Sequence, residues 1–200
     1  MKEDILEQIT ADYLNLKGYF VLTNTKYKPS ASDPEWNSKQ DGVHSDIAVI
    51  GFHPCKSPPY KVIAVNCKSW QDGFRAAYEL KAIGTGKVVS GGERWKAFRE
   101  LASPKWGRAF KNKIYELTQQ TEFEHWIVYT KFVDPCKGND WTSNPSFHKN
   151  LTPHLRIPSL KEIFTETMNS MTTTPANSEL GRLIQLLKSA IPDFSHSLKR

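Results

Sequence analysis

Residues 62–70 read VIAVNCKSW, a run that starts as a buried strand and ends with an amide, a thiol, a lysine and a tryptophan. A strand that only fills a core has no use for Lys68 there, because an unpaired ammonium group is costly to bury or shifts its pKa. Either the strand ends in solvent at Asn66, or Lys68 has a chemical role. A second stretch bears on this choice: Asp46 opens another apolar, β-branched run, DIAVIGF.

The two runs are predicted to be neighbouring strands. The turn-forming segment HPCKSPP leads from the first run into a strand over residues 60–67. If the strands pair antiparallel, the start of one lies beside the end of the other, so Asp46, Asn66 and Lys68 are neighbours. Asn66 and Lys68 then share one face of the sheet, and Cys67 lies on the other. A carboxylate, an amide oxygen, the backbone carbonyl of Cys67 and an ammonium group suit a Mg²⁺ ion, or Mn²⁺, beside a phosphate.

The rest of the chain gives an α/β order of elements. Residues 2–17 are predicted to be a helix with the apolar stripe Ile5, Ile9, Tyr13 and Leu16. The further expected elements are a strand at 19–25, a polar loop at 28–43, helices at 74–83, 93–101 and 104–118, a strand at 124–132, and helices at 160–171 and 179–190. This order predicts a mixed central sheet flanked by helices, with C-terminal helices after it.

The segments HSDIAVIG and VIAVNCKSW resemble the signature of the PD-(D/E)XK nucleases, the restriction-endonuclease-like superfamily with an αβββαβ core. The resemblance spans roughly residues 3–132. It implies metal-dependent hydrolysis of DNA phosphodiesters. Asp46 would be the metal-binding aspartate, Asn66 would take the Glu position of the tripeptide, and Lys68 would be its lysine.

Glu7 extends this resemblance. Mrr-like members of the superfamily carry a glutamate in the first helix ahead of a Gly-Tyr pair at the start of a strand, and Glu7 precedes Gly18-Tyr19 by a similar spacing. Glu7 would be a further metal ligand or would position a water. By periodicity alone it lies off the apolar stripe, so a solvated glutamate is the alternative.

Asn66 departs from the pattern of the superfamily, because a neutral amide stands where most members have a carboxylate. The cation site loses one negative charge, which weakens its affinity unless another carboxylate compensates. Three functions therefore stay open: a nuclease, an inactive nucleic-acid-binding module of the same fold, and a protein-interaction subunit.

The net charge of +6 is unevenly distributed. Residues 93–116 hold seven Lys or Arg and three Glu, and the helix expected at 104–118 has a basic face. A basic segment favours a polyanion such as DNA, although a solvated lysine-rich helix looks the same in sequence. Trp70 could stack on a nucleotide or form a lid on the core. The candidate nucleic-acid contacts are Trp70, Gln71, Lys105, Arg108 and Lys111.

Other classes of protein find no support in the sequence. No apolar stretch is long enough to cross a bilayer and the acidic N-terminus is unlike a signal peptide, which predicts a cytoplasmic protein with no membrane contact. Three scattered cysteines without metal-site spacing are expected to be reduced thiols. We expect a nuclease-like domain over residues 1–171 and a linker with a C-terminal helix over 172–200. A homodimer is compatible with double-strand cutting.

Overall fold

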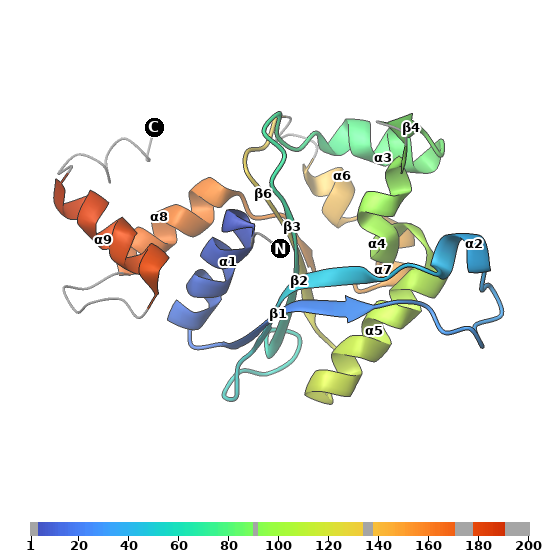
Figure 1. Ribbon diagram of the computed structural model, residues 1–200, viewed down its shortest axis with the longest axis horizontal. Coiled ribbons are helices and arrows are strands. Elements are labelled where there is room, and N and C mark those ends of the chain that lie inside the picture. The colour runs from blue at the N-terminus through green and yellow to red at the C-terminus, as the bar shows by residue number, and fades with distance from the viewer. Residues whose placement is uncertain (1–3, 90–91, 134–137, 171–177, 191–200) are drawn as a thin grey trace.

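The computed structural model describes residues 4–89, 92–133, 138–170 and 178–190. Its centre is a mixed five-stranded sheet flanked by helices on both faces (Figure 1), which confirms the expected α/β plan. The first three strands in the sheet pair antiparallel, whereas the third, fourth and fifth run parallel. In spatial order the strands are β1 (Phe20–Tyr27), β2 (Ser45–Phe52), β3 (Val62–Lys68), β6 (Glu124–Tyr129) and β7 (Leu155–Arg156).

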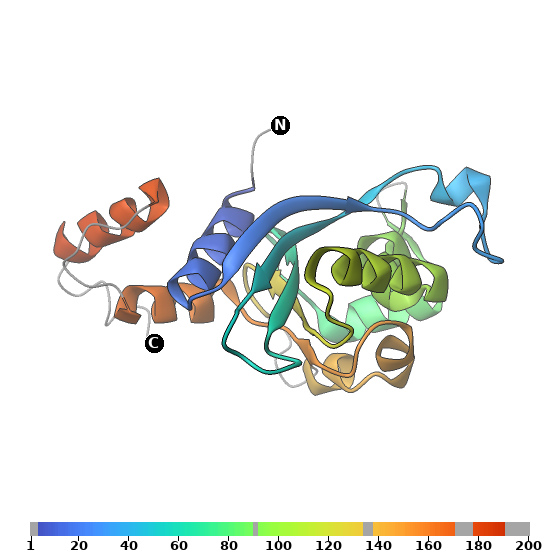
Figure 2. The ribbon, with the colours of Figure 1, turned by 90° about the horizontal axis from the view of Figure 1, so that it is seen from below.

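Two hydrophobic clusters hold the helices on the sheet. The α1-side cluster joins α1 (Ile5–Leu16) and α8 (Leu160–Ser170) to one face, and α4 (Arg99–Ala102), α5 (Pro104–Thr118) and α7 (Pro145–Asn150) cover the other (Figure 2). Large members of the α1-side cluster are Leu6, Ile9, Leu14, Val65, Trp126 and Ile163. Large members of the cluster on the other face, here the α5-side cluster, are Tyr27, Ile47, Phe98, Trp106, Phe110 and Trp141.

Helix α1 buries a different stripe from the expected one. Its buried residues are Leu6, Ile9, Thr10, Ala11, Tyr13 and Leu14. Ile5 is 66% exposed and Leu16 is 43% exposed, so the predicted stripe was wrong at both ends. The buried face is therefore rotated toward Glu7, which is only half-exposed. The helix starts at Asp4, whose side chain accepts a hydrogen bond from the backbone N–H of Leu6.

The irregular regions of the sequence contain short elements that periodicity did not reveal. The polar loop holds α2 (Ser38–Asp41), and the stretch after β6 holds α6 (Gly138–Thr142), α7 and β7. A small hairpin of β4 (Val88–Val89) and β5 (Gly92–Glu93) follows α3 (Ala76–Gly84). The basic segment begins with a 3₁₀ helix, η1 (Arg94–Phe98). Helix α9 (Glu179–Ala190) lies where it was expected, whereas residues 172–177 of the expected linker fall outside the described residues.

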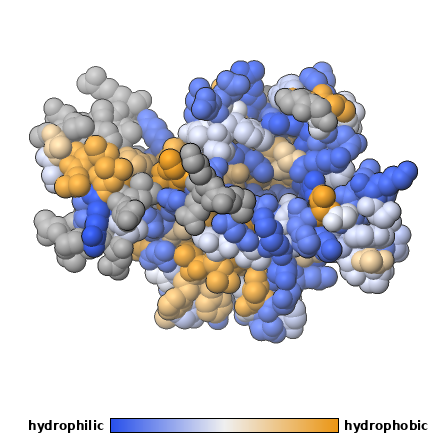
Figure 3. Space-filling view, viewed as in Figure 1, coloured by the Kyte–Doolittle hydropathy of each residue, from blue (hydrophilic) through white to orange (hydrophobic). Residues whose placement is uncertain are grey.

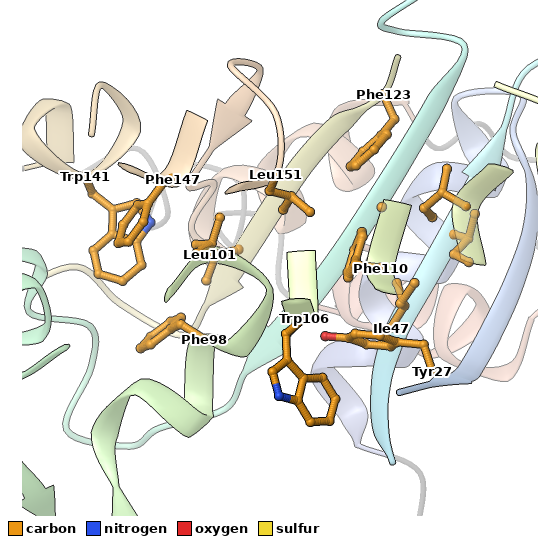
Figure 4. Packing of buried hydrophobic residues seen from close by; sticks show 14 of the residues in the cluster. Tyr27, Ile47, Phe98, Leu101, Trp106, Phe110, Phe123, Trp141, Phe147 and Leu151 are labelled. Atoms are coloured by element: carbon orange, nitrogen blue, oxygen red, sulfur yellow. The ribbon is translucent and has the colours of Figure 1, made fainter. Parts of the chain in front are cut away.

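The α5-side cluster is rich in aromatic rings. Figure 4 shows the side chains of Tyr27, Trp106 and Phe110 around Ile47. These four side chains pack between β1, β2 and α5. Trp106 is fully buried, and its Nε1 donates a hydrogen bond to Asp41 Oδ1 at 3.1 Å. The polar loop is therefore tied to α5 through a buried polar contact.

The surface is mainly hydrophilic around α3 and α4, and apolar side chains gather near the ends of β1 and α5 (Figure 3). Phe20 and Leu22 of β1 are 71% and 52% exposed. In the described sheet β1 is an edge strand, because it pairs only with β2. Within the described residues, no helix has both the length and the apolar character that a membrane crossing requires.

We predict that Gly107→Ala destabilises the protein although alanine is the better helix former. A Cβ at Gly107 would collide with the backbone carbonyl of Asn150 and lie 3.0 Å from that of Glu100, so α5 would have to move away from α4 and α7. The free energy of unfolding should fall by about 2 kcal/mol in urea titrations. Gly84→Ala is the control, because nothing lies within 4 Å of its added methyl group; it should raise stability by up to ~1 kcal/mol. Equal effects at both positions would contradict the packing.

Candidate active site

Strands β2 and β3 part where the sequence places the candidate residues. Their ladder runs from Phe52–Val62 to Val49–Val65 and ends there. The same register, if continued, would set Asp46 opposite Lys68. Instead the start of β2 and the end of β3 run in different directions (Figure 1), and we call this place, beyond Val49 and Val65, the divergence point. The divergence frees backbone groups of both strands from the ladder, so a ligand can approach them.

Asn66 and Lys68 point to the same face of the sheet, as expected. Asn66 donates a hydrogen bond from Nδ2 to Oε1 of Glu100 at 2.8 Å, and the ammonium group of Lys68 lies 5.3 Å from the ring centroid of Phe98. Both contacts are with the α5 side of the molecule. Burial lowers the pKa of Lys68, while the charges of Glu100 and Asp46 oppose this shift. None of the ion pairs among the described residues includes Lys68.

By the alternation of β2, Asp46 leaves its strand on the α1 side, whereas Asn66 and Lys68 leave β3 on the α5 side, so these residues approach the divergence point from the two faces of the sheet. The neighbouring Ile47 belongs to the α5-side cluster, whereas Ala48 and Val49 both belong to the α1-side cluster. The usual alternation breaks at this point, and Asp46 precedes the break on the α1 side. The partner strand is irregular at the same level, because Asn24 has a left-handed backbone with φ of 53°. Lys26 Nζ lies 4.0 Å from the Asp46 carboxylate.

The first turn of α1 brings Glu7 to the divergence point. Ser69 donates a hydrogen bond to Asp4 at 2.6 Å, and Thr10 Oγ1 lies 3.8 Å from Cys67 Sγ, so α1 packs on the end of β3. Glu7 lies between these two contacts. Its pKa is raised by burial and then by the charges of Asp4 and Asp46, while Lys26 and Lys68 lower it. The charge of Asp46 therefore acts on Glu7, so Glu7 does not behave as the fully solvated glutamate of the alternative interpretation.

The oxygen donors at the divergence point suit a hard cation. Within the described residues, no group of three or more His, Cys, Asp or Glu side chains is arranged to hold a metal ion. Mg²⁺, however, is often bound by one or two carboxylates together with substrate phosphates and waters. Asp46 and Glu7 provide two such carboxylates, and the Oδ1 atom of Asn66 is buried and has no partner within the described part of the chain. These residues fit a cation that shares its coordination with a substrate.

Asn66 contacts a buried polar cluster of three residues, Glu100, Tyr27 and His125, that the sequence analysis did not single out. Glu100 of α4 is 2% exposed and lies 3.6 Å from Nε2 of His125; its other oxygen accepts a hydrogen bond from the hydroxyl of Tyr27 at 3.4 Å. Burial alone raises the pKa of Glu100, but His125 and Lys68 outweigh it and hold this pKa below its usual value. The available signal was a histidine inside the apolar strand EHWIVY, which marks a buried polar group that needs a partner.

Two of the three basic residues expected to contact nucleic acid have structural partners. Lys105 is 8% exposed; it lies 2.8 Å from Asp41 and donates to the backbone carbonyl of Glu35. Arg108 donates two hydrogen bonds to Asp33 and pairs with Glu35. Both residues fasten the loop that precedes β2, so the placement of Lys105 on the solvated face of α5 was wrong.

Lys111 is the third of these basic residues, and it is half-buried. Burial and the neighbouring Arg108 lower its pKa. With Arg108 and Lys149 it lines a cavity of about 450 Å³ between α5 and α7. In this cavity Lys111 and Lys149 provide the basic groups that could face a phosphate.

Trp70 serves the core, whereas Gln71 is exposed. The indole of Trp70 packs edge-on against Phe98 and stacks with Phe74, and the guanidinium group of Arg94 lies 4.0 Å from its ring centroid. Its ring is therefore covered by other side chains of the protein. This agrees with the prediction that Trp70 forms a lid on the core and does not stack on a nucleotide.

We predict that Lys105→Met costs stability rather than only nucleic-acid affinity. Loss of the ammonium group leaves the fully buried carboxylate of Asp41 unpaired, which should lower the free energy of unfolding by about 3 kcal/mol. Lys113→Met, which breaks an exposed pair with Glu116, should cost about 0.5 kcal/mol or less. Urea titrations of both variants measure the difference. Normal stability of Lys105→Met combined with weaker DNA binding would contradict the structural role.

We predict that Cys67 reacts slowly with thiol reagents. Burial, with Glu7 and Asp4, raises the pKa of its thiol to about 12 against the hydrogen bond from Thr10, so little thiolate forms at pH 8. In a Cys136→Ser background, the exposed Cys55 should react at once with Ellman's reagent and Cys67 roughly 10³ times more slowly than an ordinary thiol. Glu7→Gln should speed the labelling of Cys67 and Glu116→Gln should not. Rapid labelling of both Cys55 and Cys67 would contradict the packing of α1 on the end of β3.

No protein-family model matches the chain, and no curated protein or solved structure matches it. The likeness to the PD-(D/E)XK nucleases therefore stands on the residues of the two strand segments, on Glu7 and on the order of the elements. A function has to be inferred from the side chains at the divergence point.

Proposed function

We propose that the protein is a metal-dependent DNA endonuclease with a restriction-endonuclease-like core. The observation that carries this proposal is the meeting of Glu7, Asp46 and Lys68 at the divergence point, where the charges of the two acids and of the lysine act on one another. The strand order also supports it, since three antiparallel strands are followed by a parallel strand with helices on both faces.

Asp46 and Glu7 are the residues that would hold the cation, Mg²⁺ or Mn²⁺. The pKa of Glu7 is raised by burial first and then by the like charges of Asp4 and Asp46, which a cation would relieve. When bound, the cation supplies Lewis-acid stabilisation of the phosphoryl oxygens and favours ionisation of a water. The backbone carbonyl of Cys67, at the end of β3 that pairs with β6 but not with β2, stays a candidate ligand.

Lys68 is the residue that would act on the phosphate. Its ammonium group is half-buried near the ring of Phe98 and has no ion-pair partner among the described residues, and burial lowers its pKa. In the reaction a water oxygen bonds to phosphorus while a P–O ester bond breaks and the leaving oxygen takes up a proton. Lys68 stabilises the charge that grows on the phosphoryl oxygens.

DNA is the proposed partner, and its backbone would extend beyond the cut site. Of the basic residues predicted to contact it, Lys105 and Arg108 are bound to acids, so Lys111 is the remaining candidate, with Lys149 beside it in the same cavity. Such contacts make binding weaken as salt rises. The homodimer stays a prediction, for which the exposed edge of β1 is the simplest site of pairing.

A plasmid-nicking assay tests the proposal. Supercoiled plasmids of varied sequence are incubated with Mg²⁺ or Mn²⁺ and with EDTA, and the rate of conversion to open-circular and linear forms is measured. Lys68→Ala and Asp46→Asn should lower the rate about 100-fold or more. Lys81→Ala, which removes an exposed lysine of α3, should leave it unchanged. Cutting that survives EDTA or Lys68→Ala would sink the proposal, and salt-sensitive DNA binding without cutting would favour the inactive binding module.

A further inference from the structure

Glu100 is a buried carboxylate whose neighbours come from three strands. Tyr27 belongs to β1, Asn66 to β3 and His125 to β6, and all three polar groups approach the same carboxylate under α4. Burying a carboxylate is costly, and these contacts together with the charge of Lys68 offset the cost. The one carboxylate–amide contact in this group is at 2.8 Å, with Asn66.

The contact with Glu100 decides which way the Asn66 amide is turned. An ionised carboxylate only accepts hydrogen bonds, so the NH₂ group of the amide must face it. Nδ1 of His125 donates to the carbonyl of Ala64 at 3.1 Å, and Nε2 lies 3.6 Å from Oε1 of Glu100, beyond hydrogen-bond distance. The amide oxygen is then turned away from Glu100. Oδ1 is buried, with Asn66 only 6% exposed, and has no partner among the described residues.

The freed oxygen belongs to the first residue of β3 beyond the ladder with β2. It lies on the face that also carries Lys68, and at the position where the superfamily pattern has a carboxylate oxygen. A hydrogen bond to a charged acceptor also polarises the amide, which increases the negative charge on its oxygen. An amide with a carboxylate behind it is thus a better cation ligand than an isolated amide.

We propose that Glu100 is a positioning residue that holds the Asn66 amide with its oxygen toward the divergence point, where this oxygen is a ligand of the divalent cation. The inference rests on the proposed function for the identity of the ligand. The neutral amide of Asn66 lacks the negative charge of a carboxylate. Glu100, which accepts a hydrogen bond from this amide, supplies a negative charge next to it. Glu100 acts through Asn66 and touches no substrate.

The first test measures Mn²⁺ binding without DNA, by calorimetry and by the electron paramagnetic resonance signal of free Mn²⁺. Glu100→Gln keeps the shape of the side chain, but its amide can turn either way, so Asn66 is no longer fixed; Mn²⁺ affinity should fall about tenfold or more. Asn66→Ala should weaken binding by a similar factor. The double variant Asn66→Ala/Glu100→Gln should bind Mn²⁺ no more weakly than Asn66→Ala alone, because Glu100 acts through Asn66. Glu116→Gln, an exposed loss of one carboxylate, should bind as the wild type does.

The second test exchanges the two groups. Asn66→Asp alone sets two carboxylates against each other and should lower both the urea midpoint of unfolding and Mn²⁺ affinity. Adding Glu100→Gln restores one amide facing one carboxylate, with the roles reversed, and the charge of the wild type. The exchanged double variant should recover the unfolding midpoint and bind Mn²⁺ at least as tightly as the wild type. If Glu100 had only a structural role, the exchanged double variant would recover the unfolding midpoint at most and would not recover Mn²⁺ affinity.

The outcomes separate this inference from the proposed function. Unchanged Mn²⁺ affinity in folded Glu100→Gln, additive losses in the first double variant, or a wild type that binds no Mn²⁺ would overturn the positioning role. A wild type that shows the expected pattern of Mn²⁺ affinities but cuts no plasmid would leave the positioning role standing and overturn the nuclease. Metal-dependent cutting by the wild type, together with additive losses of Mn²⁺ affinity in the double variant, would support the nuclease and overturn the positioning role.

Discussion

A buried carboxylate that has to be neutralised ties the sheet to α4. Glu100 meets groups from β1, β3 and β6, and each meets it only if its strand holds its register. A shift of one residue in β3 would turn Asn66 to the other face and leave the charge without its closest donor. The aromatic packing around Trp106 and Phe98 gives most of the burial energy of this side, but apolar contacts tolerate small shifts far better than a buried charge does. The polar contacts therefore define the register that the apolar cluster stabilises.

The same physics accounts for the basic segment. Lys105 neutralises Asp41 in the core, and Arg108 holds Asp33 and Glu35, so cations of α5 are used to fasten the polar loop before β2. Although burial alone raises the pKa of Asp41, Lys105 and the backbone N–H of Asn37 hold it below its usual value. The loop is anchored directly ahead of Asp46. The electrostatics of α5 thus contribute to the candidate site by fixing where β2 begins, and not only by attracting an anion.

Local pattern was sufficient for the longer strands β1, β2, β3 and β6 and for the longer helices, because their signals are carried by adjacent residues. The runs that contain Ile47 and Val65 are apolar and β-branched, and Pro104 opens α5 as expected. The face of Asp46 could not be read locally, since it depends on a break of alternation that involves Asn24 on the neighbouring strand. Helical periodicity likewise placed Lys105 in solvent, because it cannot show that a loop 64 residues earlier returns to cover it. Glu100 was missed for the same reason: its partners lie 34 and 73 residues away in sequence.

The charges around the divergence point are sorted by face. Asp4, Glu7 and Asp46 lie on the α1 side, and Lys68 approaches from the α5 side, where no carboxylate of the described residues forms an ion pair with it. This arrangement is electrostatically unfavourable, because burial and the neighbouring acids raise the pKa of Glu7 while burial lowers the pKa of Lys68. In the proposed function, a divalent cation near Glu7 and Asp46 and a phosphate near Lys68 would offset both effects. The unfavourable electrostatics of the free protein thus match a cation–phosphate pair in sign and in order across the two strands.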